Sequence, residues 1–139
     1  MPWEIDRDEA FEKALKGLQK RFPNAEEDIL DVFKGGHPAR TDPIPKFEEK
    51  LWKGRVRSSD ARRGASGGFR VIYYWDKSSP NWCCLGTFYF KGDYENLPND
   101  DLNRLFISVK GRFERLLREQ AEKEKTQSGE EPDEGSAGG

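Results

Sequence analysis

Apolar residues recur at helical spacing in two stretches near the start of the chain and in one stretch near its end. The expected helices run from an N-cap at Asp6 to Pro23, from a cap at Asn24 to the glycine pair 35–36, and from Asn99 to about Lys125. In each stretch an apolar side chain returns every three or four residues, which places these side chains on one face of a helix. An acid three residues after each of the first two caps completes a pattern that stabilises a first turn.

Four shorter stretches combine β-branched and aromatic residues between turn-forming residues, which is typical of strands. The expected strands cover residues 3–5, 51–58, 69–75 and 82–90, and the proline-rich segment 37–50 is expected to be a loop. The last three strands follow one another through short links, so they predict an antiparallel meander. Strand 69–75 is apolar on both faces, which indicates a central strand that is covered twice.

These elements predict an α+β fold with a small antiparallel sheet. The sheet would contain the short N-terminal strand plus the three-strand meander, accompanied by an N-terminal helix pair and a long C-terminal helix. A chain of 139 residues suits one domain, which we expect to span residues 1–125. Residues 126–139 are rich in Gly, Glu and Ser and carry four acids and no base, which predicts a disordered acidic tail.

Basic residues gather in the middle of a chain that is close to neutral. The formal net charge is −2, and without the acids of the predicted tail it would be +2. One acid, Asp60, stands against seven bases in this region: Lys50, Lys53, Arg55, Arg57, Arg62, Arg63 and Arg70. Such a cluster favours an anionic partner. A solvated face on which the arginines pair with Glu48, Glu49 or Asp60 explains the same charges, and composition alone does not separate the two interpretations.

Several chemistries have no support in the sequence. Cys83 and Cys84 are adjacent and would point to opposite faces of a strand, so no disulfide is expected. The single histidine, His37, lies in a Gly-Gly-His-Pro loop, which excludes a two-histidine ribonuclease. No spacing of His, Cys and acids fits a metal site, and we expect neither a metal nor a cofactor. No apolar run reaches about 18 residues and no signal-peptide pattern is present, so we expect no membrane contact and a cytoplasmic protein.

The basic residues of the predicted sheet include several candidates for anion binding. Lys53, Arg55 and Arg57 alternate along one strand, so they would project from the same face. Arg70 stands at the start of the most apolar strand, where a guanidinium needs a partner, either a carboxylate, a loop carbonyl or a bound phosphate. Across an antiparallel sheet Arg70 could share a face with the alternating row.

Two residues at the end of the last strand complete the candidate set. Tyr89 and Lys91 share a face there; the tyrosine could stack on a base or transfer a proton, and the lysine could hold a phosphate. A plain rim aromatic is the alternative for Tyr89. The glycines of the loop 64–68 could form an anion-binding nest or simply permit the turn. Without histidine or metal, catalysis here would rest on electrostatic stabilisation by Arg and Lys.

The segment WKGRVRSSDARRGASGGFRVIYYW (52–75), followed by LGTFYFKGDYENL (85–97) and an amphipathic helix, resembles the RelE/HigB group of bacterial type II toxin–antitoxin ribonucleases, in the RelE/ParE superfamily. The shared pattern is a basic strand, a Gly-rich basic loop, Gly-x-Arg before an aliphatic pair and two tyrosines, and a strand that ends Tyr-x-Lys. The resemblance implies the RelE-like fold and a metal-independent endoribonuclease, an mRNA interferase that needs no cofactor. Its substrate would be mRNA on the ribosome, its effect inhibition of translation, and its partner a cognate antitoxin.

The resemblance also implies roles for individual residues. Cleavage by attack of the RNA's own 2′-hydroxyl would leave a 2′,3′-cyclic phosphate and a 5′-hydroxyl end. The catalytic residues would be Lys53, Arg55, Arg70, Tyr89 and Lys91, with Arg70 on the scissile phosphate, and Arg57, Arg62 and Arg63 would bind RNA. Some members carry a further tyrosine past the last-strand lysine; here only Tyr94 is nearby, and Gly92 stands where an arginine is frequent. The general base is therefore open between Lys53, Lys91 and Tyr89.

Two other functions fit the same resemblance. One is a ParE-like toxin, which inhibits DNA gyrase without cutting RNA. The other is a catalytically inactive member that keeps the fold only to bind a protein partner. The basic strand and Arg70 favour the ribonuclease, because a gyrase inhibitor does not require a cluster shaped for phosphate.

Overall fold

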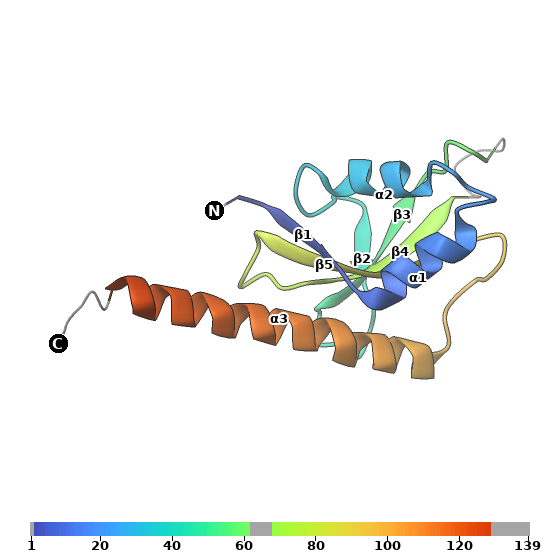
Figure 1. Ribbon diagram of the computed structural model, residues 1–139. Coiled ribbons are helices and arrows are strands. Elements are labelled where there is room, and N and C mark those ends of the chain that lie inside the picture. Colours follow the sequence, from blue (N-terminus) through green and yellow to red (C-terminus); the bar gives the residue numbers. More distant parts are fainter. Residues whose placement is uncertain (1, 62–67, 129–139) are drawn as a thin grey trace. The chain divides into compact units, whose positions relative to one another are not determined.

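The computed structural model describes residues 2–61 and 68–128, which form an α+β fold with a five-strand mixed sheet and three helices (Figure 1). The elements in chain order are β1 (Glu4–Arg7), α1 (Glu9–Leu18), α2 (Ala25–Phe33), β2 (Thr41–Pro43), β3 (Leu51–Val56), β4 (Phe69–Trp75), β5 (Trp82–Phe90) and α3 (Asn99–Ser128). The strands lie in the order β1-β5-β4-β3-β2, so the apolar strand β4 is the central one.

The prediction of a wholly antiparallel sheet is wrong at one edge. Strands β2 to β5 pair antiparallel, but β1 pairs parallel to β5, with Ile5 opposite Cys83. The chain between β1 and β5 contains both short helices and three strands. This is long enough for the crossover connection that a parallel strand pair requires. Strand β2, which lies within the predicted loop 37–50, was missed because it has only three residues and ends in a proline.

One predicted helix cap is wrong, and the other is confirmed in position but lacks the capping hydrogen bond. Asp6 lies in β1, and Asp8 caps α1 instead, where its carboxylate accepts a hydrogen bond of 3.1 Å from the Ala10 N–H. Asn24 stands at the N-cap position of α2 without capping it, because its side chain bonds to Asp60 at 2.9 Å. Helix α3 extends to Ser128, three residues into the predicted tail, and residues 129–139 lie outside the described part. None of the helices in residues 2–61 and 68–128 has the length and apolar character needed to cross a membrane.

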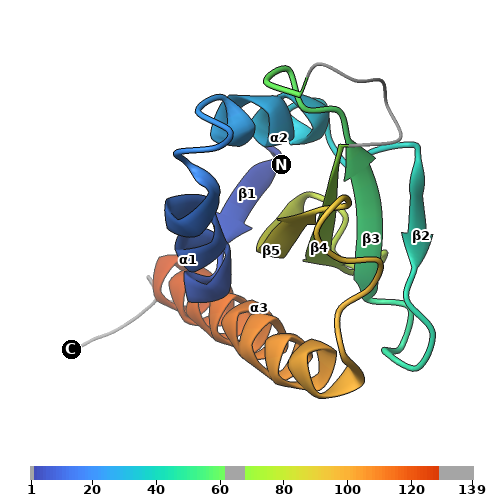
Figure 2. The same ribbon diagram turned by 90° about the vertical axis from the view of Figure 1, so that its right-hand side faces the viewer.

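Helices α1 and α2 cover one face of the sheet (Figure 2). Phe11 of α1 packs on Phe88 at 5.2 Å between ring centroids, and Phe33 of α2 packs edge-on against Tyr73 at 4.9 Å. These rings are almost completely buried. Aromatic pairs of this geometry add to the burial of apolar area, so this face holds the main core.

The opposite face is covered at one end by the first turns of α3. Leu105 approaches β5 so closely at Gly86 that a Cβ there would lie 3.0 Å from a leucine methyl. Phe106 stacks on Tyr74 at 6.2 Å between centroids. By its internal contacts the chain forms two compact units, Met1–Val109 and Lys110–Gly139; the described part of the second is the remainder of α3.

Strand β4 is therefore buried on both faces along most of its length. The α3-covered face carries Arg70, Ile72 and Tyr74, which alternate along the strand. The first turns of α3 cover the Tyr74 end of this face. The Arg70 end is consequently where the basic residues of β3 and the end of β5 come together.

We predict that Gly68→Ala destabilises the protein by about 1–3 kcal/mol, because overpacking a closed site costs about this much. A Cβ at Gly68 would lie 2.2 Å from the carbonyl oxygen of Val56, and a backbone atom cannot swing aside. Urea unfolding followed by circular dichroism measures the change. Gly17→Ala is the control: this exposed position in α1 has no atom within 4 Å, so the helix should gain about 0.5–1 kcal/mol. Equal stability of the two variants would contradict the close approach at Gly68.

Candidate anion-binding site

Strand register places the candidate side chains in a row across the sheet. Arg70 of β4 lies opposite Arg55 of β3 on one side and opposite Tyr89 of β5 on the other. Directly opposed residues in an antiparallel sheet have Cβ atoms about 4.5–5.5 Å apart and point to the same face. Lys53 lies two residues before Arg55 and so shares this face. Two long cationic side chains thus meet directly across one strand pair.

The Arg70 guanidinium is buried without a balancing carboxylate. The residue is 6% exposed, and its Nη1 donates one long hydrogen bond of 3.3 Å to the Phe69 carbonyl oxygen. Among residues 2–61 and 68–128, no Asp or Glu forms an ion pair with it. Its pKa is lowered by burial and then by Arg55, and Tyr89 opposes this only in part. A guanidinium has five N–H donors, so most of them have no hydrogen-bond acceptor within the described residues.

Lys53 lies in the field of the other cations. Its pKa is lowered by burial first and then, in decreasing order, by Arg70, Lys91 and Arg55. Its cross-strand neighbour in β2, the acid Asp42, raises the pKa by the smallest contribution. Arg55, Arg70 and Lys91 are therefore each close enough to Lys53 to repel it, and we call these four residues the basic cluster.

Tyr89 borders the basic cluster as a neutral donor. Its side chain is almost completely buried, and its hydroxyl donates a hydrogen bond of 3.3 Å to the Glu95 carbonyl oxygen. Burial raises the pKa of Tyr89 more than the neighbouring Arg70 lowers it. The phenol thus stays protonated at neutral pH, which suits it to donate a proton and not to act as a general base.

The segment from Lys91 to Pro98, between β5 and α3, passes in front of β4 and β3 in Figure 2. Lys53 Nζ donates to Asn96 Oδ1 at 2.9 Å, which brings the segment to the cluster. Tyr94 meets Tyr89 edge-on at 6.2 Å between centroids and is 58% exposed. Sequence reasoning noted Tyr94 only as a neighbour of the motif and missed Asn96, because no spacing rule relates residue 96 to residue 53.

An ion pair holds this segment on its other side. Both oxygens of the Asp93 carboxylate accept hydrogen bonds from the Arg21 guanidinium, at 2.7 and 3.3 Å. Arg21 lies in turn over the rings of Phe22 and Phe90. The acid nearest to Lys91 in the chain is therefore paired with Arg21 and does not neutralise the basic cluster.

The alternative of a salt-bridged basic face does not apply to the basic cluster. Asp60 accepts hydrogen bonds from Asn24 instead, and Glu48 forms an ion pair with Lys50. Arg57 is exposed just beyond the end of β3, and no described contact joins it to the cluster. The predicted RNA-binding residues Arg62 and Arg63, with loop residues 64–67, lie outside the described residues.

His37 was expected to be a loop residue without chemistry, and it lies in a cluster of rings. Its imidazole stacks on Trp75 at 3.7 Å with an interplanar angle of 8°, and packs edge-on against Trp52. A hydrogen bond of 2.8 Å joins its Nε2 to the Tyr73 hydroxyl. Burial lowers the pKa of His37, so the ring is neutral at pH 7. These contacts give it a packing role on the face opposite the basic cluster.

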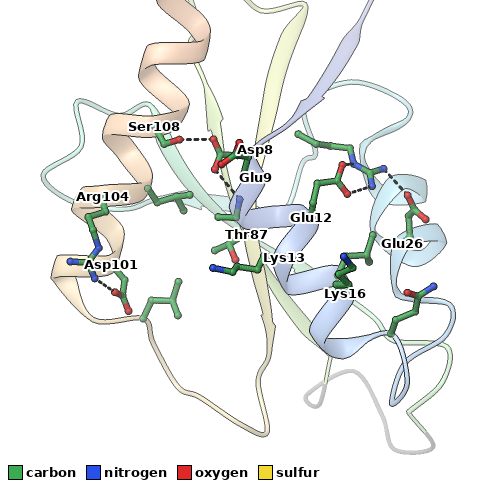
Figure 3. Close-up of a pocket in the computed structure, with 16 residues that line it drawn as sticks. Asp8, Glu9, Glu12, Lys13, Lys16, Glu26, Thr87, Asp101, Arg104 and Ser108 are labelled. Carbon is green, nitrogen blue, oxygen red and sulfur yellow. Dashed lines mark hydrogen bonds and ion pairs between the residues drawn. The ribbon is translucent and has the colours of Figure 1, made fainter.

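A separate groove of about 1260 Å³ lies between α1 and the start of α3, with Thr87 of β5 among its lining residues (Figure 3). None of the predicted site residues lines it. Several of its charges pair with one another: Arg7 with Glu12 and Glu26, and Arg104 with Asp101. Ser108 donates a hydrogen bond of 2.7 Å to the buried Asp8, which ties the start of α3 to the cap of α1. The groove therefore has a different character from the basic cluster.

The basic cluster contains the side-chain types that bind phosphate and other oxyanions in proteins. Guanidinium groups bind phosphate oxygens through paired N–H donors, and ammonium groups add point charge. Within residues 2–61 and 68–128, no three His, Cys, Asp or Glu side chains come together as metal ligands.

No model of a known protein family matches the chain, and no curated protein matches it.

We predict that Lys53→Met raises the stability at pH 7 by a few tenths to about 1 kcal/mol, the size of one cross-strand like-charge contact. The pKa of Lys53 is lowered in the folded state, so its charged form opposes folding at pH values below that pKa. The gain should shrink as the pH approaches 10.5, the ordinary pKa of a lysine in an unfolded chain. Urea unfolding at pH 7 and 10 measures it, with Lys77→Met in the exposed β4–β5 turn as the control. A loss of stability at pH 7 would contradict the repulsion.

Proposed function

We propose that this protein is a metal-independent endoribonuclease of the RelE/HigB type, the toxin of a type II toxin–antitoxin pair. The observation that carries the proposal is the buried Arg70 guanidinium, which lies beside Lys53 and Arg55 and has no carboxylate partner in the described part of the chain. Burying charge without a partner costs free energy, and a site that binds a phosphate recovers that cost only when the ligand is present. The order of sequence motifs described above supports the same family.

In the proposed reaction the basic cluster binds the phosphate that is cleaved. The RNA 2′-oxygen attacks the adjacent phosphorus, the bond from phosphorus to the 5′-oxygen breaks, and the products are a 2′,3′-cyclic phosphate and a 5′-hydroxyl. Negative charge grows on the non-bridging oxygens in the transition state. Arg70 and Arg55 are arranged to donate to those oxygens, and fixed donors of this kind lower the barrier most where water is excluded.

Lys53 is our choice for the base that accepts the 2′-hydroxyl proton. Burial and three neighbouring cations lower its pKa, so more of it is a neutral amine at pH 7–9 than of an ordinary lysine. Tyr89 is the neutral donor that can supply a proton to the leaving 5′-oxygen, since burial raises its pKa. The proton taken from the 2′-hydroxyl and the proton given to the 5′-oxygen thus pass through two different side chains.

The proposed substrate is mRNA on the ribosome, and the proposed protein partner is an antitoxin. The two alternatives predict different results with purified protein. A gyrase inhibitor would block supercoiling and leave mRNA intact, and a non-catalytic member would bind its partner and do neither. The unneutralised guanidinium supports the ribonuclease over both, because neither alternative needs an oxyanion-binding cluster.

We predict that Arg70→Ala lowers the rate of mRNA cleavage on translating ribosomes at least about 100-fold, the cost of removing one donor that stabilises transition-state charge. Arg70→Lys should recover only part of the rate, because an ammonium cannot make the paired contact of a guanidinium. The readout is primer extension across the cleaved mRNA, with growth arrest on expression as a second measure. Lys77→Ala, at the opposite end of β4, controls for loss of one positive charge and should leave the rate unchanged. Full activity of Arg70→Ala would refute the assignment.

We predict that the single-turnover cleavage rate rises with pH from 7 to 9, because the neutral fraction of Lys53 grows as the pH approaches its lowered pKa. Lys53→Arg keeps the positive charge but cannot release a proton at these pH values, so its rate should be low and independent of pH. Rapid-quench measurements across this pH range test the point. If Lys53→Arg keeps the pH dependence of the wild type, another group accepts the proton.

A further inference from the structure

Asn96 presents one half of its amide to the basic cluster and the other half to solvent. Its oxygen accepts the hydrogen bond from Lys53 Nζ at 2.9 Å. Both the charged and the neutral form of the Lys53 amine can donate this hydrogen bond, so the amide oxygen can face Lys53 in either state. The Asn96 NH₂ group bonds to no other residue in the described part of the chain, and the residue is exposed. Two N–H donors are therefore free directly beside Lys53.

Tyr94 supplies an aromatic surface two residues before Asn96. Its ring is held edge-on against Tyr89, and much of the residue remains exposed. The Arg21–Asp93 ion pair fixes the chain immediately before it. Exposed tyrosines beside a basic site stack on unpaired nucleobases, and such stacking does not depend on which base is present. A base that lies on Tyr94 has its edge within reach of the same short segment.

We propose that Asn96 selects the nucleobase next to the bound phosphate and favours guanine over adenine there; this inference rests on the proposed ribonuclease function. A free asparagine amide reads adenine with its oxygen and its NH₂ together, as acceptor from N6 and donor to N7. With its oxygen occupied by Lys53, Asn96 offers donors only. Guanine presents two neighbouring acceptors, O6 and N7, and matches such a donor pair. Adenine presents N7 beside an amino group, which would face the NH₂ of Asn96 unfavourably.

A purely positioning role for Asn96, in which it only holds Lys53, gives a different outcome when the donors are removed. Asn96→Asp keeps an oxygen for Lys53 and replaces the NH₂ donors by an acceptor. If Asn96 reads the base, this variant accepts from the amino group of adenine and loses the preference for guanine. If Asn96 only positions Lys53, the variant changes the rate for every base by the same factor.

The test compares cleavage of ribosome-bound mRNAs that differ only in the base on either side of the cleaved bond. For the wild type we expect a guanine-to-adenine ratio of kcat/KM of roughly tenfold at one of these two positions, the discrimination of one good base contact. Asn96→Asp should lower this ratio to one or below it. Asn99→Asp adds the same charge at the start of α3 and should leave the ratio at the wild-type value.

Three results would overturn the inference. The first is a wild type that cleaves without a preference between guanine and adenine at either position. The second is a ratio that stays the same in Asn96→Asp. The third is a wild type that neither cleaves these mRNAs nor binds 2′-deoxy analogues of them in fluorescence anisotropy; that result rejects the proposed function as well, whereas the first two leave it standing.

Discussion

The register of three strands brings like charges together, and the rest of the site depends on it. Arg55 and Arg70 face each other across β3 and β4 although their repulsion opposes the pairing. Aromatic and aliphatic side chains buried on both faces of β4 hold the ladder in place and offset that repulsion. A slip of one residue would turn Arg70 into the core beneath α1 and α2, so the sheet has one register compatible with both its core and its charges.

The face that carries the basic cluster has two parts, one packed against α3 and one that contains the basic cluster itself. The first turns of α3 cover one end, where Leu105 and Phe106 pack against the sheet. The segment between β5 and α3 borders the other end through Asn96 and Tyr94. Arg21 binds the Asp93 carboxylate away from the cluster. Because of this arrangement the buried guanidinium of Arg70 has no neutralising partner among residues 2–61 and 68–128.

The sequence predicted the elements that have strong periodicity, and it missed features that depend on distant parts of the chain. Strands β4 and β5 begin and end as predicted, because their apolar runs are bounded by turn residues. The direction of β1 was not predictable, since either direction buries Ile5. The cap of α1 was misplaced by two residues because Asp6 and Asp8 are both acids near its start, and Ser108, a hundred residues away, bonds to the second of them.

The same contrast holds for the site. That Lys53, Arg55, Arg70 and Tyr89 lie on one face of the sheet was predictable, because alternation along a strand is visible locally. Asn96 was not, because its importance comes from a contact with a residue 43 positions earlier. The direction of the pKa changes also needed the structure, since it depends on burial and on which cations are neighbours. The sequence motifs identify the candidate residues, but the burial and the neighbours of each residue determine how its pKa is shifted.

The connection between Asn96 and α3 is so short that a movement of the helix would be transmitted to the basic cluster. Only Leu97 and Pro98 separate the amide that bonds Lys53 from the first residue of the helix, and Leu97 lines the groove beside Leu105. A proline limits how far such a link can flex. A movement of the start of α3 would therefore be passed through two residues to the hydrogen bond between Asn96 and Lys53. Arg70, in contrast, stands on the central strand of the sheet, so the two sides of the basic cluster are tied to different elements.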